Sequence, residues 1–152
     1  RVFQTKLDAA YACYSYDIKE PAESMDVVYC FAAAHHFRAH RRTLKELHRI
    51  LRPGGTALYL YEPACPQWLH GISYRRVNRI RPEVEEDVLV WKKLLRIARE
   101  AGLEARVDFH PSTLRRRPMP AIYFAGLSVL PFLSRFVPCT ANFVFTRPVA
   151  AH

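Results

Sequence analysis

The sequence is poor in glycine, and its few cysteines lack any metal-ligand spacing; both features argue against classes of protein. Its 152 residues include five glycines, none of them in a Gly-x-Gly turn, so the usual signature of a nucleotide-binding loop is missing. The four cysteines are scattered, without a Cys-x-x-Cys pair or a histidine at metal-ligand spacing, which argues against a zinc module or a disulfide scaffold. We therefore expect no metal, and a cytoplasmic location.

Long apolar runs and targeting signals are also missing. No apolar run reaches the roughly 20 residues that a membrane-spanning helix needs, and residues 1–8 resemble neither a signal peptide nor a transit peptide. Half of the residues are apolar and 24% are charged, as in a globular domain. Because the first residue is Arg1 and not Met, we expect residues 1–152 to be a single, N-terminally truncated domain.

Acidic residues are scarce relative to basic ones, with 14 against 23 and a net charge of +9. Such an excess favours an anionic partner, and arginines cluster within residues 38–42, 75–81 and 115–117. Because no known nucleic-acid-binding module is recognisable, nucleic acid is the less favoured partner, and an anionic membrane surface stays open.

Residues 26–62 carry the strongest pattern in the chain. Residues 27–31 are rich in β-branched and aromatic side chains, as in a buried parallel strand. Leu44, Leu47 and Leu51 then place one apolar stripe on a helix, which stops at the sequence Arg-Pro-Gly-Gly. A second apolar strand follows at residues 57–61. The pattern predicts a βαβ unit within a parallel sheet.

The same stretch resembles class I S-adenosylmethionine-dependent methyltransferases, specifically methyltransferase type 11-like domains. The matching features are an acidic residue before a Val-Val strand, a His-His pair after it, and a helix end of the form L-x-E-x-x-R-x-L-x-P-G-G. Here these are Asp26, His35-His36, and the run from Leu44 through Glu46 and Arg49 to Pro53-Gly54-Gly55. The resemblance implies that residues 26–62 correspond to the family's fourth strand, the helix after it, and the fifth strand.

The resemblance also implies candidates for the cofactor site. Residues 9–16 would be the family's third strand, followed by Asp17 and Ile18 as the acidic and apolar pair beside adenine; a plain turn is the alternative. Small residues at 32–34 would leave room for S-adenosylmethionine beside Cys30 and Phe31. His35 and His36 end the strand, where doubly wound sheets bind ligands, so both are candidate catalytic residues, and His35 also a cofactor contact. The alternative is that one histidine only packs or caps the next helix.

Residues 64–81 read as a long irregular linker of mixed aromatics and arginines. In the resembling enzymes this region varies with the substrate, so Trp68, His70, Tyr74 and Arg75 are candidate substrate contacts, unless they are packing residues.

The second half of the chain predicts a helix, an insertion and two strands. A helix is expected over residues 82–101, with acidic residues in its first turn and Gly102 as its cap. Strands are expected at 103–109 and 141–147, the family's sixth and its antiparallel seventh. Residues 110–137 form a basic, then apolar, insertion: either a helix covering the sheet, or an apolar lid that contacts a membrane surface.

The missing glycine-rich turn implies that the family's first two strands have no counterpart here. The expected fold class is therefore α/β, with a partial Rossmann-like sheet in the order 3-4-5-7-6, mostly parallel. An apolar sheet edge tends to find a partner. We expect either that residues 9–16 pair with the strand at 27–31, or that the chain self-associates or is poorly soluble.

The function implied by the resemblance is methyl transfer from S-adenosylmethionine to a small-molecule or lipid-linked acceptor, within a larger intact enzyme. These 152 residues by themselves are expected to be inactive. The alternatives are a non-catalytic, methyltransferase-like partner subunit and a basic nucleic-acid-binding module, whose affinity would fall steeply with salt.

Overall fold

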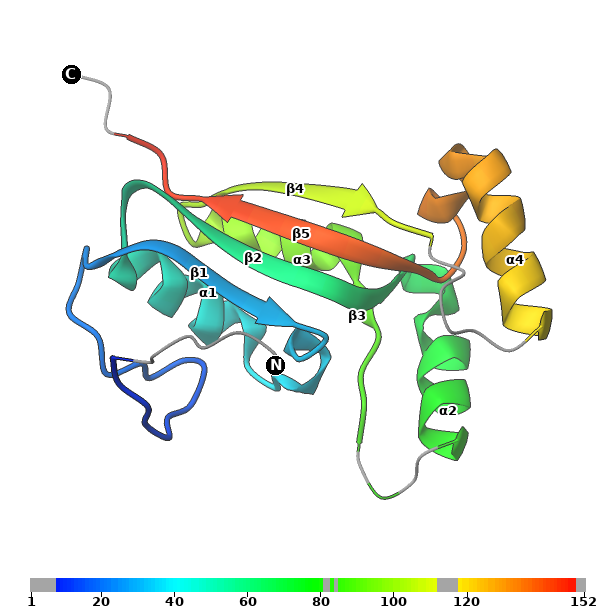
Figure 1. Ribbon diagram of the computed structural model, residues 1–152, viewed down its shortest axis with the longest axis horizontal. Coiled ribbons are helices and arrows are strands. Elements are labelled where there is room, and N and C mark those ends of the chain that lie inside the picture. Colours follow the sequence, from blue (N-terminus) through cyan, green and yellow to red (C-terminus); the bar gives the residue numbers. More distant parts are fainter. Residues whose placement is uncertain (1–7, 81–82, 84, 112–117, 150–152) are drawn as a thin grey trace, which may run out of the picture.

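One mixed sheet with two helices on one face forms the centre of the molecule (Figure 1). The computed structural model describes residues 8–80, 83, 85–111 and 118–149. The strands are β1 (Met25–Phe31), β2 (Leu51–Cys65), β3 (Leu89–Val90), β4 (Glu104–Phe109) and β5 (Cys139–Thr146). The helices are α1 (His40–Ile50), α2 (His70–Ile80), α3 (Trp91–Glu100) and α4 (Pro118–Val129), with short 3-10 turns η1 (Ala34–His36), η2 (Gln67–Leu69) and η3 (Pro131–Arg135).

The predicted βαβ unit is confirmed as β1, α1 and the parallel strand β2. The Pro-Gly-Gly sequence after α1 has a steric cause. Gly54 has a φ of +84°, and a Cβ on Gly55 would lie 2.9 Å from the carbonyl oxygen of Arg52 and 3.0 Å from that of Met25. Only glycine fits both positions, because one backbone is left-handed and the other is crowded.

Glu46 and Arg49 of the same motif hold the chain that leads into β1. A carboxylate oxygen of Glu46 accepts the backbone N–H of Ile18 at 2.9 Å. The guanidinium of Arg49 donates to the carbonyl oxygens of Ile18 and Glu20, and is also paired with Glu46 at 2.7 Å. These two motif residues are therefore structural: they fasten residues 18–20 to α1.

The strand order is β1-β2-β5-β4, with β5 antiparallel to both of its neighbours and β3 paired to the end of β2. In the family's numbering this is 4-5-7-6, so the α/β fold class and the antiparallel last strand are confirmed. Helices α1 and α3 contact each other and pack on one face, where Leu44, Ile50 and Phe143 are almost fully buried.

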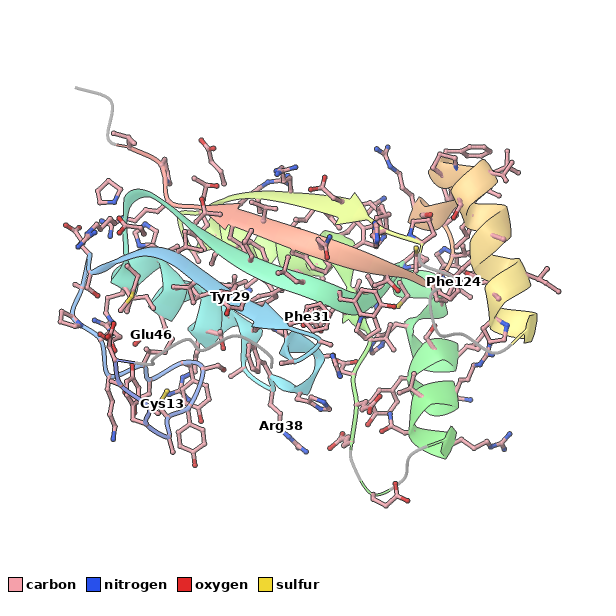
Figure 2. The ribbon with its side chains drawn as sticks, in the orientation of Figure 1. Cys13, Tyr29, Phe31, Arg38, Glu46 and Phe124 are labelled. Carbon is pink, nitrogen blue, oxygen red and sulfur yellow. The ribbon has the colours of Figure 1, made fainter. Side chains whose placement is uncertain are left out.

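The opposite face of β1 is open and apolar. Val27, Tyr29 and Phe31 are 59%, 71% and 64% exposed, while Val28 and Cys30 between them pack toward the core, as strand alternation requires. Figure 2 shows Tyr29 and Phe31 on the side of β1 away from α1. Within the described chain, β1 also has only β2 as a neighbour, so it is an edge strand.

The expected strand at residues 9–16 is wrong, and so is its expected pairing with β1. This segment is irregular and mostly exposed, with an isolated bridge between Tyr14 and Asp17. Ser15 bonds to Thr43 of α1 at 2.9 Å, and the Arg42 guanidinium lies 3.9 Å from the centre of the Tyr16 ring. The segment follows α1 instead of a sheet edge (Figure 1), because α1 offers it these side-chain partners.

The expected irregular linker at 64–81 is also wrong, since most of it is the helix α2. The expected helix over 82–101 begins late, at Trp91, and ends at Glu100 with Gly102 left-handed after it. Residues 81, 82 and 84 lie outside the described chain. The acidic residues do not form a helical first turn: Glu85 bonds to Tyr74 at 2.7 Å and Asp87 to His70 at 2.8 Å, which ties this loop to α2.

The insertion at 110–137 contains α4 and η3, beyond the end of the sheet and beside α2 (Figure 1). The described part of the insertion does not cover the face of the sheet, so that alternative is wrong for these residues. Ile122, Val129, Phe132 and Phe136 are more than half exposed. Arg115, Arg116 and Arg117 lie outside the described residues. Among the described helices, none has both the length and the apolar character to cross a membrane.

Candidate functional site

A buried carboxylate organises the ends of β1 and β2. Glu62 is 0% exposed, yet it accepts four hydrogen bonds from the turn that follows β1. One oxygen accepts the backbone N–H groups of Ala33 and Ala34 at 2.8 and 2.7 Å. The other accepts the backbone N–H of His35 at 3.1 Å and its ring Nδ1 at 2.7 Å. Glu62 therefore fixes the position and the ring orientation of His35.

The environment keeps Glu62 ionised. Burial by itself raises the pKa of the Glu62 carboxyl, but the hydrogen bonds from His35, Ala34 and Ala33 outweigh burial, and the pKa lies below its ordinary value of 4.5. Burial and the nearby Glu62 carboxylate raise the pKa of the Cys30 thiol to about 12. Cys30 is thus a protonated thiol at neutral pH and not a nucleophile.

Backbone strain lies on both sides of this carboxylate. Ala32 and Tyr61 have left-handed φ values of 46° and 60°, which non-glycine residues seldom adopt. The conformation at Tyr61 accompanies a bulge between Tyr59 and Glu62, and Asn142 of β5 accepts the Tyr61 N–H at 2.8 Å. The bulge turns Glu62 inward, and the rings of Phe31 and Tyr61 stack 5.6 Å apart.

A cavity of about 650 Å³, here called the histidine cavity, opens beside the His35 turn. Its lining includes His35, His36, His40 and His70, four of the seven histidines in the chain. It also includes Arg38, Glu85, Asp87 and Lys93. Burial lowers the pKa of His40, so that ring is neutral at neutral pH.

A second cavity of about 740 Å³, here called the apolar cavity, lies between α2, α4 and the ends of β2 and β5. Ala32 and Tyr61 line it, so it reaches the strained ends of β1 and β2. Most of its wall is apolar, from Leu69, Ile72, Val77, Val88, Tyr123 and Phe124. Arg76 is the one charged residue among its described lining residues.

The structure gathers some predicted cofactor contacts and separates others. Cys30 and His35 contact Glu62 at the end of β1, while Phe31 points to the opposite face of the strand and stacks on Tyr61. Asp17 and Ile18 lie against α1 instead, with Ile18 held by Glu46 and Arg49. The predicted roles of all five residues, and the catalytic roles of His35 and His36, stay predictions.

The predicted substrate contacts lie on the side of η2 and α2 away from the apolar cavity. Trp68 and Arg75 are exposed, while His70 and Tyr74 bond to Asp87 and Glu85. The α2 residues that line the apolar cavity are Ile72, Ser73, Arg76 and Val77. Sequence reasoning missed this set because residues 64–81 were not expected to be helical; the apolar spacing of Leu69, Ile72 and Val77 was the available signal.

All three arginines of the cluster at residues 38–42 have partners within the protein. Arg38 pairs with Glu85, Arg41 with Glu100, and Arg42 stacks on Tyr16. The two ion pairs offset the charges of Arg38 and Arg41, whereas Arg42 keeps its charge while it stacks on Tyr16.

Comparisons with known proteins agree with this architecture. The family model described as a methyltransferase domain matches residues 4–59. No curated protein sequence shows significant similarity to the chain.

Several solved structures share the fold. A Haloferax volcanii protein assigned as a methyltransferase, in complex with the Trm112 methyltransferase activator, is 18% identical with a TM-score of 0.59; the match covers 92% of this chain and 61% of that one. The Haemonchus contortus phosphoethanolamine N-methyltransferase 2, with phosphomonomethylethanolamine and S-adenosylhomocysteine, is 14% identical with a TM-score of 0.60, over 91% of this chain and 37% of that one. The [4+2]-cyclase SpnF is 15% identical with a TM-score of 0.57, over 92% and 56%.

This chain therefore spans less than two thirds of the length of each of these three proteins. The methyltransferase model covers β1, α1 and the first part of β2, and the structural matches extend over nine tenths of the chain. The predicted resemblance is confirmed: residues 4–59 match the methyltransferase domain family, and the chain has the fold of these solved structures.

Proposed function

We propose that this chain supplies the acceptor pocket and one side of the cofactor site of an S-adenosylmethionine-dependent methyltransferase that acts on a small-molecule or lipid-linked acceptor. The observation that carries the proposal is the apolar cavity, which ends at Ala32 and Tyr61 beside the Glu62-anchored turn. Ligands of open α/β sheets bind at the carboxyl ends of the strands, where this cavity opens.

The residues present fit part of S-adenosylmethionine. Phe31 offers an exposed ring at the end of β1, and the small residues Ala32, Ala33 and Ala34 leave room beside it. A glycine-rich turn for the remainder is absent from this sequence. We propose that Phe31 and the turn at 32–35 hold one side of the cofactor. We also propose that these 152 residues by themselves do not catalyse methyl transfer.

The cofactor supplies an electrophilic methyl group, so the protein's part is mainly to place the acceptor in line and to exclude water. The apolar wall of the cavity suits an acceptor with a hydrocarbon or aromatic body, and Arg76 suits an anionic or carbonyl group on it. Where the acceptor must lose a proton, His35 is the proposed base. Its Nδ1 is held by Glu62, which leaves Nε2 to accept the proton.

Substitution of two adjacent arginines of α2 tests whether the apolar cavity binds the acceptor. Methyl transfer from labelled S-adenosylmethionine is measured with the protein expressed from its complete coding sequence, on a panel of amphiphilic acceptors. Arg76→Ala should raise the acceptor KM roughly tenfold, the loss typical of one charge-assisted contact, while Arg75→Ala on the far side of α2 should not. Activity that depends on Arg75 and not on Arg76 would move the acceptor to the predicted substrate residues.

The exposed surface of α4 and η3 favours peripheral membrane contact, and with it a cytoplasmic, membrane-associated location. Ile122, Val129, Phe132 and Phe136 present apolar side chains there, and Arg135 lies in η3. We propose that this surface brings the cavity to a lipid-linked acceptor. Flotation with anionic vesicles should recover the protein, and Phe132→Ser with Phe136→Ser should release it; equal recovery of both proteins would reject membrane contact.

The open edge of β1 favours a second candidate function, that of a partner subunit without catalysis of its own. Val27, Tyr29 and Phe31 form an exposed apolar row beside unpaired backbone groups, which suits pairing with another polypeptide. The solved Haloferax volcanii complex shows a protein of this fold assembled with an activator. Light scattering should show self-association that Tyr29→Lys reduces; a monomer at all concentrations would reject pairing between copies of this chain.

A further inference from the structure

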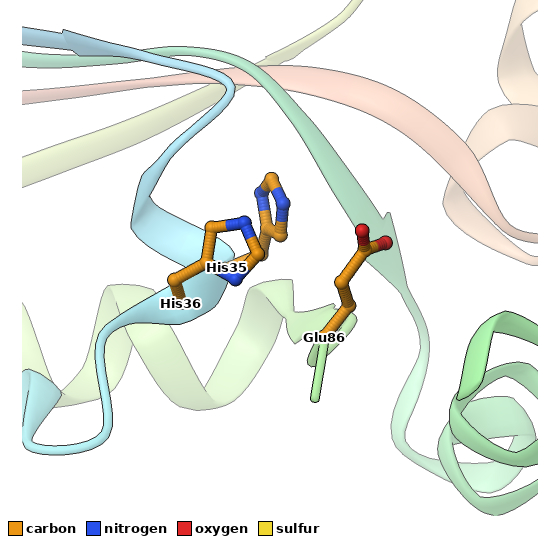
Figure 3. Close-up of side chains that lie close together, drawn as sticks. All are labelled: His35, His36 and Glu86. Carbon is orange, nitrogen blue, oxygen red and sulfur yellow. The ribbon is translucent and has the colours of Figure 1, made fainter. Parts of the chain in front are cut away.

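We propose that His35, His36 and Glu86 form a binding site for a divalent transition-metal cation such as Zn²⁺. One ring nitrogen of each histidine and a carboxylate oxygen of Glu86 lie within 4.8 Å of one another (Figure 3). Two imidazoles and one carboxylate are a ligand set that zinc and other first-row metals accept, with at least one position left open for water or a substrate atom. The proposal does not depend on the methyltransferase function.

The buried Glu62 gives His35 the support that a metal-bound histidine needs. Metal-bound histidines commonly donate their second ring N–H to a carboxylate, which fixes the ring and makes the ligating nitrogen more basic. Nδ1 of His35 lies 2.7 Å from a carboxylate oxygen of Glu62, which leaves Nε2 as the ligating nitrogen. His35 can serve as a metal ligand or as a base through this nitrogen, so the two roles are alternatives.

Backbone hydrogen bonds hold the two ligand-bearing segments against each other. The N–H of Asp87 donates to the carbonyl oxygen of His35 at 3.2 Å. Asn78 of α2 clamps Glu86, accepting its N–H at 3.0 Å and donating to its carbonyl oxygen at 2.8 Å. The ligands therefore come from two fixed segments, the turn after β1 and the loop before β3, and α2 holds the second of these in place.

The three ligand atoms need to move only a little closer together to bind a metal ion. Ligand atoms on a tetrahedral zinc lie about 3.3–3.6 Å apart, given bonds of about 2.0–2.2 Å, so the three groups need to close by roughly 1 Å. His36 is exposed, so its ring can rotate to close this gap. The cavity is lined by more basic than acidic residues, with Arg38, Arg41, Arg42, Lys93 and Arg96 against Glu85 and Asp87, so a cation must be held by its direct ligands. Arg38 and Arg41 are already paired, with Glu85 and Glu100.

The sequence could not show this site. Sequence analysis predicted no metal because the cysteines form no Cys-x-x-Cys pair and have no histidine at metal-ligand spacing. The third ligand is some fifty residues further along the chain. The folded contact between the β1 turn and the loop before β3 brings Glu86 to the histidines.

Titration with Zn²⁺, without cofactor or acceptor, tests the site. Cys13→Ser serves as the background, since Cys13 is an exposed thiol. We expect one saturable site, and His36→Gln and Glu86→Gln should each weaken binding at least tenfold. His70→Gln is the matched control, because His70 lines the same cavity but bonds to Asp87 outside the cluster; it should bind within twofold of the background protein.

Glu62→Gln gives a second readout, since loss of a supporting carboxylate commonly weakens metal binding by about 10- to 100-fold. Co²⁺ absorption should report a four-coordinate nitrogen and oxygen site that is lost in Glu86→Gln. Far-UV circular dichroism must show each variant folded. Absence of saturable Zn²⁺ binding, or unchanged affinity in folded His36→Gln and Glu86→Gln, would overturn the proposal, as would an equal loss in His70→Gln.

Discussion

Replacing Glu62 by glutamine isolates what the buried carboxylate contributes to stability. The side-chain shape is kept, and one oxygen can still accept from Ala33 and Ala34. The amide NH₂ then faces the two N–H donors of His35, so those two hydrogen bonds are lost. A hydrogen bond to a charged group contributes about 1.5–3 kcal/mol, and the smaller desolvation cost of the neutral amide offsets part of the loss. We expect Glu62→Gln to lower the free energy of unfolding by about 2–4 kcal/mol.

Urea unfolding measures this loss as a lower midpoint at an unchanged m value. Asp108→Asn is the control, because Asp108 pairs with Arg106 at 2.7 Å on the surface, and such pairs contribute at most about 0.5–1 kcal/mol. Since the pKa of folded Glu62 lies below 4.5, its stabilisation is complete above pH 4.5 and is lost as the pH falls through the lower, folded pKa. A Glu62→Gln cost no larger than that of Asp108→Asn, or one that grows on acidification, would refute the reasoning.

Two further predictions concern the motif around α1. Gly55→Ala should destabilise by about 1–3 kcal/mol, because its Cβ would lie 2.9 Å from a carbonyl oxygen, whereas Gly71→Ala in α2 meets nothing within 4 Å and should stabilise by up to about 1 kcal/mol in the same thermal melt. Arg49→Met should release residues 18–20 from α1, seen as faster proteolysis of the segment before β1, while Arg41→Met, which breaks only the exposed pair with Glu100, should leave the rate unchanged.

The sequence predicted the elements whose causes are local. Strand β1, α1 and β2 follow from a β-branched run, an apolar stripe and a Pro-Gly-Gly stop, and each cause lies within a few residues of its effect. The failed strand at 9–16 has strand-like composition, but a strand also needs a neighbour, and composition cannot say that α1 would offer better partners. The late start of α3 has the same origin: Glu85 and Asp87 find Tyr74 and His70 across space.

The sequence predicted where in the fold the candidate site lies, but it did not predict the residue at its centre, Glu62. The His-His pair after a parallel strand indicated the carboxyl end of the sheet, which is where both cavities open. Glu62 gave no signal, because a single carboxylate after a strand is ordinary in sequence. Its importance comes from complete burial and from four donors that converge on it, which are properties of the folded chain.

The strained residues explain why a charge is buried at this point. Ala32 and Tyr61 each hold a left-handed backbone at a cost of about 1–2 kcal/mol, and such strain persists only where surrounding contacts fix it. The N–H of Ala32 bonds to Leu60 at 2.8 Å, and Glu62 takes the next three N–H groups in turn. A neutral side chain would bind those donors more weakly and let the turn relax. The buried carboxylate therefore offsets the strain, and it holds the His35 ring at the wall of the histidine cavity, where either a proton or a metal can bind it.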